Sequence, residues 1–197
     1  MFKFWMSLLF VALISGCQGE EETANEPDDT DTSRAIVQTP ELVEKLTGAS
    51  FSEQFDVLYE EYSDLIDTSD DLAGPDEDVD GVRDDISAFI DAMVESEEIK
   101  LAIKQEARLY HRVMSNEFLG EPEEVLKSAY EIALLGLSIT ACYEYRGLTL
   151  EEEREVSSML EKLTFNTKER IIAYIRYNKL LDGTSYTLLE PEERNCE

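Results

Sequence analysis

The chain has 197 residues, enough for one domain with flanking tails, and its formal net charge is -28. Aspartate and glutamate together number 45, against 17 lysines and arginines. A field of this sign repels phosphate backbones and anionic lipid headgroups, so it argues against nucleic-acid binding and favours cations or basic proteins as partners.

The first 16 residues have the organisation of a secretion signal. Lys3 gives a short positive start, and residues 4–14 are almost wholly apolar. A run of about a dozen apolar residues is too short to span a bilayer, where roughly 20 are needed. We therefore expect residues 1–16 to be a signal peptide that is removed from the mature protein.

The stretch LISGC at the end of this segment resembles the lipobox of bacterial lipoproteins. The matching residues are Ile14, Ser15, Gly16 and Cys17. The resemblance implies that Cys17 carries a diacylglyceryl group and becomes the first residue of the mature chain. Two or three acyl chains anchor a protein stably to a membrane. The residue after the cysteine is Gln18 and not an aspartate, which resembles the pattern of lipoproteins that are sorted to the outer membrane. This resemblance implies that the protein lies on the periplasmic face of the outer membrane in a bacterial cell envelope.

The residues that follow the cysteine are strongly acidic. Between positions 18 and 34 there is no large apolar side chain, and Pro27 interrupts the segment. Such a composition cannot bury enough apolar surface to offset the entropy lost on ordering. We expect residues 17–35 to comprise the lipidated cysteine and a disordered tether, with the folded domain occupying 36–197.

The rest of the chain has helical periodicity and shows no sustained strand-like alternation. Pro40 opens a short helix that Gly48 ends. Ser50 and Glu53 then resemble a capping box for a second helix, which should end near Asp67. The apolar residues of this second helix recur at three- and four-residue spacing; they are Phe51, Phe55, Leu58, Tyr59, Tyr62 and Leu65.

Two more apolar stripes follow the acidic loop. The first contains Ile86, Phe89, Ile90, Met93 and Val94, and the second, which starts after Ser96, contains Ile99, Ile103, Ala107, Tyr110 and Met114. Gly120 ends the second stripe, and Pro122 suits the first turn of the next helix. That helix runs to about Tyr145. Because residues 132–142 are apolar nearly all round, we expect it to be the central, most buried helix.

Two further helices complete the pattern. Thr149 with Glu152 resembles a capping box, and Thr167 caps a last helix that Gly183 stops. The apolar residues of this last helix are Ile171, Ile172, Ile175 and Leu180. Short connections favour antiparallel neighbours. We therefore predict an all-α domain, a single bundle of about six or seven helices.

Two cysteines remain besides Cys17. An even remainder in an oxidising compartment predicts a disulfide between Cys142 and Cys196, which would tie the C-terminus to the central helix. The alternatives are two free thiols or an intermolecular bridge through Cys196.

Residues 76–85, DEDVDGVRDD, contain the most specific local pattern of the chain. Three aspartates alternate, Gly81 follows at once, and a fourth aspartate comes four residues after the third. Ca²⁺ binds six to eight oxygens, and alternate carboxylates before a glycine bend can point several of them inward. We predict a cation site whose ligands are Asp76, Asp78, Asp80, the Val82 carbonyl and Asp84. The alternative is an acidic helix cap without metal.

This stretch resembles the DxDxDG calcium loops of EF-hands, dockerins and thrombospondin type 3 repeats, which implies Ca²⁺ as the ion. The chain departs from the EF-hand pattern at its twelfth position, where Ser87 replaces a bidentate glutamate, and at its eighth, where Arg83 replaces an aliphatic residue. Asp85, or Asp70 and Asp71, are candidates for the missing ligand. We expect a weak site, with a dissociation constant of about 10⁻⁴–10⁻³ M.

These features support three classes of function. The first is a lipid-anchored bacterial envelope protein that acts as a non-enzymatic, Ca²⁺-stabilised binding or structural module. The second is an accessory lipoprotein of an envelope complex, whose acidic surface binds a basic envelope protein without metal. The third is a carboxylate-dependent hydrolase, for which the abundant carboxylates single out no catalytic pair. His111 is the sole histidine, which excludes a zinc site of the HExxH type.

Overall fold

The computed structural model describes residues 35–116 and 118–197, and within these it contains α-helices and short 3₁₀ helices but no β-strand. The prediction of an all-α bundle is confirmed. The predicted signal peptide, the lipidation site Cys17 and the acidic tether lie outside the described residues.

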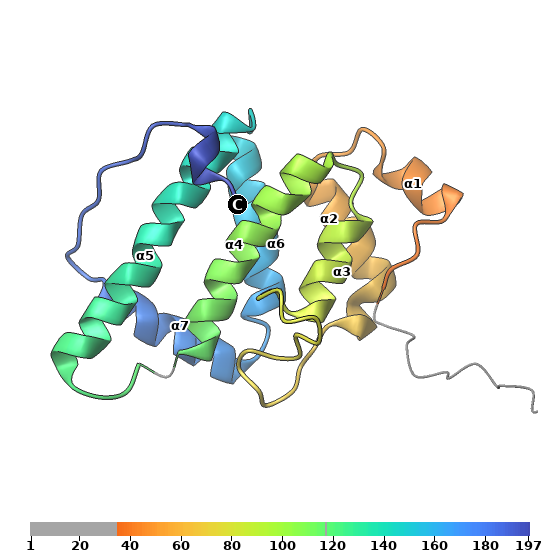
Figure 1. Cartoon of the computed structure of the whole chain (residues 1–197). Coiled ribbons are helices and arrows are strands. Elements are labelled where there is room, and N and C mark those ends of the chain that lie inside the picture. Colours follow the sequence, from red (N-terminus) through yellow and green to blue (C-terminus); the bar gives the residue numbers. More distant parts are fainter. Residues whose placement is uncertain (1–34, 117) are drawn as a thin grey trace, which may run out of the picture. The chain divides into compact units, whose positions relative to one another are not determined.

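Seven α-helices follow one another in the described chain (Figure 1). They are α1 (Pro40–Leu46), α2 (Phe51–Tyr62), α3 (Asp84–Ala92), α4 (Glu97–Ser115), α5 (Pro122–Tyr145), α6 (Leu150–Thr164) and α7 (Lys168–Leu180). The 3₁₀ helix η1 (Ser63–Leu65) extends α2, and η2 (Glu193–Asn195) lies near the C-terminus.

The helices begin where the capping signals place them. Ser50 with Glu53 forms a reciprocal capping box at α2, and Thr149 with Glu152 forms another at α6. The side chains that cap α1, α4 and α7 are Thr39, Ser96 and Thr167. Each cap gives a partner to a backbone N–H that lacks one inside the helix, and is worth about 1 kcal/mol.

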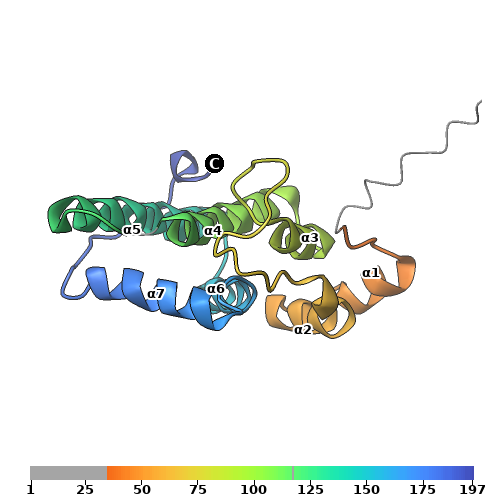
Figure 2. The same ribbon diagram turned by 90° about the horizontal axis from the view of Figure 1, so that it is seen from below.

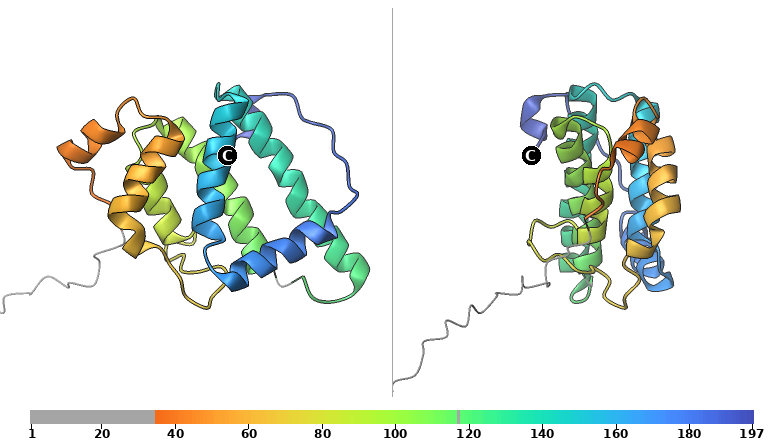
Figure 3. Two further views of the ribbon diagram at one scale, coloured as in Figure 1. Left: turned by 180° about the vertical axis from the view of Figure 1, so that it is seen from behind. Right: turned by 90° about the vertical axis from the view of Figure 1, so that its right-hand side faces the viewer.

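The described helices pack in two layers (Figure 2). One layer contains α3, α4 and α5, and the other contains α2, α6 and α7, with α1 packed beside α2. The right-hand view of Figure 3 shows the same two layers from the side. The core lies between the layers, and its fully buried side chains include Leu58, Phe89, Ile90, Ile103, Val113, Leu160 and Leu163.

The central helix is α4, so the prediction that α5 would be the most buried helix is wrong. α4 lies between α3 and α5 in its own layer and also contacts α6 and α7 in the other. α5 is at the edge of its layer, which leaves one of its sides without a neighbouring helix. Its large apolar side chains that are exposed are Leu126, Tyr130, Leu134 and Tyr145.

α5 is also the helix of the described chain that is long and apolar enough to cross a membrane. Length and composition alone are weak evidence, because a core helix of a soluble protein passes the same test. Here the helix packs against α4, α6 and α7, and it buries Ile139, Cys142 and Tyr143. These contacts are those of a helix within the bundle.

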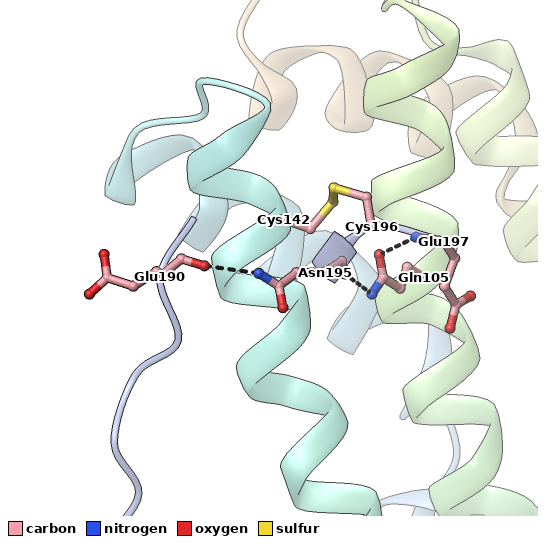
Figure 4. The surroundings of a disulfide bond; sticks show 6 residues. All are labelled: Gln105, Cys142, Glu190, Asn195, Cys196 and Glu197. Carbon is pink, nitrogen blue, oxygen red and sulfur yellow. Dashed lines mark hydrogen bonds between the residues drawn. A yellow bond between two sulfur atoms is a disulfide. The ribbon is translucent and has the colours of Figure 1, made fainter. Parts of the chain in front are cut away.

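The predicted disulfide joins Cys142 on α5 to Cys196, with an S–S distance of 2.03 Å (Figure 4). Gln105 on α4 holds the same C-terminal segment. Its amide donates to the carbonyl of Asn195 (2.9 Å), and its side-chain oxygen accepts from the backbone N–H of Glu197 (3.4 Å). For cysteines separated by 54 residues, the loop-entropy model gives a stabilisation of about 4 kcal/mol.

Candidate metal centre

The acidic motif belongs to a long irregular loop, residues 66–83, which connects η1 to α3 (yellow in Figure 1). Arg170 on α7 is fully buried, and it binds the first half of this loop from the side of the protein core. Its guanidinium donates to the carbonyls of Asp67 (2.6 Å), Asp71 (2.7 Å) and Leu72 (3.1 Å). It also donates to the carboxylate of Asp67 (2.5 Å). One side chain therefore fixes three backbone positions of the loop.

A second buried arginine, Arg83, holds the other half. It donates twice to the carboxylate of Asp85 (2.5 and 2.8 Å) and once to the carbonyl of Leu163 on α6 (2.7 Å). The same carboxylate accepts from the backbone N–H of Asp67 (2.8 Å). The arginine at the eighth position of the motif, a departure from the EF-hand pattern, thus has a structural role in this chain.

Gly74 allows the loop to pass directly over Arg83. A Cβ atom at this position would lie 2.3 Å from Cδ of Arg83, and the backbone φ of +74° disfavours any side chain. The Gly74-Pro75 pair therefore sets the path of the loop just before the acidic motif.

Three carboxylates of the motif come together at the outer side of the loop. Asp76, Asp78 and Asp84 each place an oxygen within 4.8 Å of the others. The chain returns to this point through Gly81, whose φ is +81°. The backbone N–H of Asp84, the first residue of α3, donates to the carbonyl of Pro75 (3.0 Å) and joins the two ends of the motif.

Backbone N–H groups hold these carboxylates in place. Asp76 accepts from the N–H of Asp80 (3.1 Å) with one oxygen and from the N–H of Gly81 (3.0 Å) with the other. Asp84 accepts from the N–H of Glu77 (3.1 Å). Hydrogen bonds from N–H groups to a carboxylate are charge-assisted, and they offset part of the mutual repulsion of the three side chains. The loop therefore gathers three negative charges by its own hydrogen bonds.

Two of the five predicted ligands are not among these three carboxylates. Asp80 accepts from the backbone N–H of Val82 (2.8 Å), and its own N–H donates to Asp78 (3.2 Å), so it shapes the bend. The side chain of Val82 is buried and fastens the loop to the core. The Asp80 carboxylate and the Val82 carbonyl stay predictions as ligands.

The candidates for a supplementary ligand differ in the hydrogen bonds that their carboxylates already accept. Asp85 is unsuitable, because Arg83 and a backbone N–H take up its buried carboxylate. Asp70 and Asp71 are both exposed, and Asp71 also accepts from the N–H of Ala73 (3.1 Å).

His111 on α4 lies beside the cluster, with its Nε2 3.9 Å from a carboxylate oxygen of Asp76. The two residues are far apart in the sequence, so their spacing does not predict this contact. It arises because the loop folds over α4. A neutral imidazole is compatible with a cation at the cluster, whereas a protonated one would repel it.

The negative charge of Asp67, on the inner side of the loop, is compensated by arginines of the protein itself. Burial tends to raise the pKa of Asp67, but hydrogen bonds from Arg170 and Ser69 and the charges of Arg170 and Arg83 together bring it below its ordinary value. Asp67 therefore remains ionised at neutral pH as part of a buried ion pair.

A separate buried carboxyl, Glu106 on α4, was not singled out by the sequence. It is 6 % exposed and accepts from the hydroxyls of Tyr143 (2.7 Å) and Tyr110 (3.0 Å). Burial raises the pKa of Glu106 above its ordinary value, although hydrogen bonds from Tyr143, Ser157 and Tyr110 oppose the shift. A raised pKa is typical of catalytic acids. Here both oxygens are taken up inside the core, which indicates a structural role.

Comparison of the chain with protein-family models, with curated proteins and with solved structures finds no match. The resemblances to a lipobox and to a DxDxDG loop each cover a short stretch, and neither describes the helical bundle.

Proposed function

We propose that the protein is a lipid-anchored module of the bacterial cell envelope whose acidic loop binds Ca²⁺, and that it acts by binding or structural support rather than by catalysis. The observation that carries the metal site is the approach of Asp76, Asp78 and Asp84 to within 4.8 Å. Oxygen ligands at such separations suit a hard divalent cation. The lipobox motif that ends at Cys17 supports the anchor.

The ion would act at the junction between α2 and the rest of the bundle. Arg83 and Arg170 already fix the inner side of the loop, so an ion is needed only at the outer side, where the carboxylates gather. By neutralising their repulsion it would favour the closed loop, and it would stabilise the folded state by mass action. Water and backbone carbonyls would complete the six to eight oxygens, which agrees with a weak site.

The test is a melting curve with and without Ca²⁺. At a Ca²⁺ concentration ten times the dissociation constant, binding stabilises the protein by about 1.4 kcal/mol, which raises Tm by a few degrees. Asp78→Ala should remove this rise. Asp78 is exposed, so the variant should fold normally.

Asp56→Ala provides the matched control, because Asp56 is an exposed aspartate on α2 outside the loop. This variant should keep the full response to Ca²⁺. Identical melting curves in millimolar Ca²⁺ and in chelator would reject the metal site. A response of the same size with Mg²⁺ would show a divalent site that does not select Ca²⁺.

A second candidate keeps the anchor but not the metal. Its support is that Asp76 already accepts two backbone N–H groups, so that the motif is ordered by its own hydrogen bonds. The acidic surface would then bind a basic envelope protein. Co-purification that weakens with salt and is indifferent to chelator would favour this candidate over the first.

A further inference from the structure

α7 carries apolar and basic side chains on the side that faces away from the core. Positions 168, 172, 175 and 179 form one line along a helix, because their spacing follows successive helical turns. The residues in this line are Lys168, Ile172, Ile175 and Lys179, and all four are exposed. The opposite side of the helix buries Arg170 and Tyr177. In a surface helix of a soluble protein the outermost line is ordinarily polar.

Two neighbours widen this line into a surface. Ile171 is 45 % exposed on one side, and Arg176 is exposed on the other. We call the surface of Lys168, Ile171, Ile172, Ile175, Arg176 and Lys179 the α7 face. The helix α7 itself lies toward the viewer in the left-hand view of Figure 3.

The charge of the α7 face is opposite to that of the chain as a whole. Glu169 is the single acidic residue of α7, among several lysines and arginines, whereas acidic residues greatly outnumber basic ones in the full sequence. Within the described part of the chain, Lys168, Arg176 and Lys179 have no carboxylate within 4.0 Å. These cations are therefore available to an external anion.

We infer that the α7 face docks on an anionic lipid surface. Its isoleucines would enter the boundary between headgroups and acyl chains, and its cations would pair with headgroup phosphates. An apolar centre bracketed by lysines is suited to a helix lying in the interface. A nucleic acid would satisfy the cations but leave the isoleucines in water. The acidic remainder of the protein is repelled by such a membrane, which restricts the approach to this side.

The inference rests on the proposed function in one respect, since the lipid at Cys17 would keep the helical body close to a bilayer. The chain from Cys17 to residue 35 can span at most roughly 60 Å. Because α7 lies at the far end of the bundle from α1 (Figure 1), this length of chain between the lipid and the bundle is what would let α7 approach the surface. Docking would then hold the body against the membrane in one orientation.

The experiment uses the helical body without the anchor, residues 35–197, because all seven described helices and their core lie within it. Co-sedimentation is measured with vesicles of equal parts phosphatidylglycerol and phosphatidylethanolamine, and with vesicles of phosphatidylcholine. Binding is expected to the first and not to the second, and it should weaken as salt is added. Lys168→Glu and Lys179→Glu should each reduce the affinity at least about fivefold. Ile175→Ser should reduce it at every salt concentration.

The matched controls make the same chemical changes elsewhere. Lys127→Glu alters an exposed lysine of α5, and Leu101→Ser alters a leucine of α4 that is 49 % exposed. Both should bind vesicles like the unaltered body. Absence of binding to the anionic vesicles, or equal losses in the control variants, overturns the inference. So does a result in which the α7 variants bind vesicles normally but lose an acidic protein partner.

This design separates the two proposals, since the tested body lacks Cys17. Binding by the body, together with mass spectrometry that finds no lipid on Cys17 in cells, would leave the α7 face intact and reject the anchor. A lipidated Cys17 and a body that ignores vesicles would do the reverse.

Discussion

Two regions of the bundle bury acidic groups, and they do so in opposite ways. On the inner side of the acidic loop, Asp67 and Asp85 each pair with a buried arginine, and neutral donors add one hydrogen bond to each carboxylate. Between α4 and α5, Glu106 instead meets the neutral hydroxyls of two tyrosines. The first arrangement lowers the pKa of Asp67 and keeps its carboxylate ionised, whereas burial raises the pKa of Glu106 and favours the protonated acid.

The difference shows what each region can tolerate. A buried ion pair that loses one partner leaves an uncompensated charge in the core, with a large cost in stability. A carboxyl among hydroxyls can take up a proton and stay neutral, so its environment is more forgiving. The buried arginines thus fix the conformation of the inner side of the loop. The arrangement of the carboxylates at its outer side is what a bound ion could change.

The largest effect is expected for Arg170→Ala. It removes the donors to the carbonyls of three loop residues and leaves the buried Asp67 carboxylate without its cation. Breaking such a buried pair costs about 3–5 kcal/mol in the free energy of unfolding, which urea denaturation measures.

Arg176→Ala, on the exposed side of the same helix, serves as the control and should change stability by less than about 0.5 kcal/mol. If Arg170→Ala does not fold, Arg170→Lys keeps the charge but loses the planar fork of donors, and should give an intermediate loss. Equal stabilities of the Arg170 and Arg176 variants would show that the loop does not depend on this anchor.

A smaller loss is expected for Glu106→Ala. It leaves the hydroxyls of Tyr110 and Tyr143 without their acceptor in the core, which costs about 1–3 kcal/mol. Glu106→Gln keeps an acceptor oxygen and should cost less. Glu131→Ala, at an exposed position on α5, is the control, and a loss there as large as at Glu106 would contradict the role given to the buried network.

Helix limits were the part of the fold best predicted from sequence, because caps are local. The Ser50 and Thr149 boxes and the Thr167 cap involve residues three apart, and each proved to start a helix. The disulfide followed from counting cysteines. Spacing also placed Asp76, Asp78 and Asp84 in one predicted site, and these three carboxylates lie together, since one glycine bend returns the chain to the same point.

The buried charges could not be predicted, because their partners are distant in sequence. Arg170 contacts Asp67 across 103 positions, and the general expectation for an arginine is exposure. Once Arg170 turns inward to the loop, the isoleucines of α7 must turn outward, which reverses the usual side for an apolar stripe. Glu106 left a fainter signal, as it falls between Ile103 and Tyr110 on the buried stripe of α4.

The opposite pKa shifts of the two regions predict opposite dependences of stability on pH. The pKa of Asp67 is lower in the folded protein, so its contribution is present above its ordinary value of 3.8 and is lost as the pH falls through the folded value. The pKa of Glu106 is raised on folding, so the folded state holds the proton more tightly. Its contribution is therefore greatest at acid pH and declines as the pH rises above its ordinary value of 4.5.

Urea midpoints measured from pH 3 to pH 8 should resolve these two trends, which are the smallest effects expected. The difference between the unaltered protein and Asp67→Asn should be largest at neutral pH and shrink on acidification. Glu106→Gln cannot ionise, so its stability relative to the unaltered protein should improve as the pH rises above about 4.5. Asp56→Asn, at an exposed position, corrects for the change in net charge. A Glu106→Gln curve that runs parallel to that of the unaltered protein would mean that Glu106 titrates as it does in the unfolded chain, and the contrast between the two buried regions would disappear.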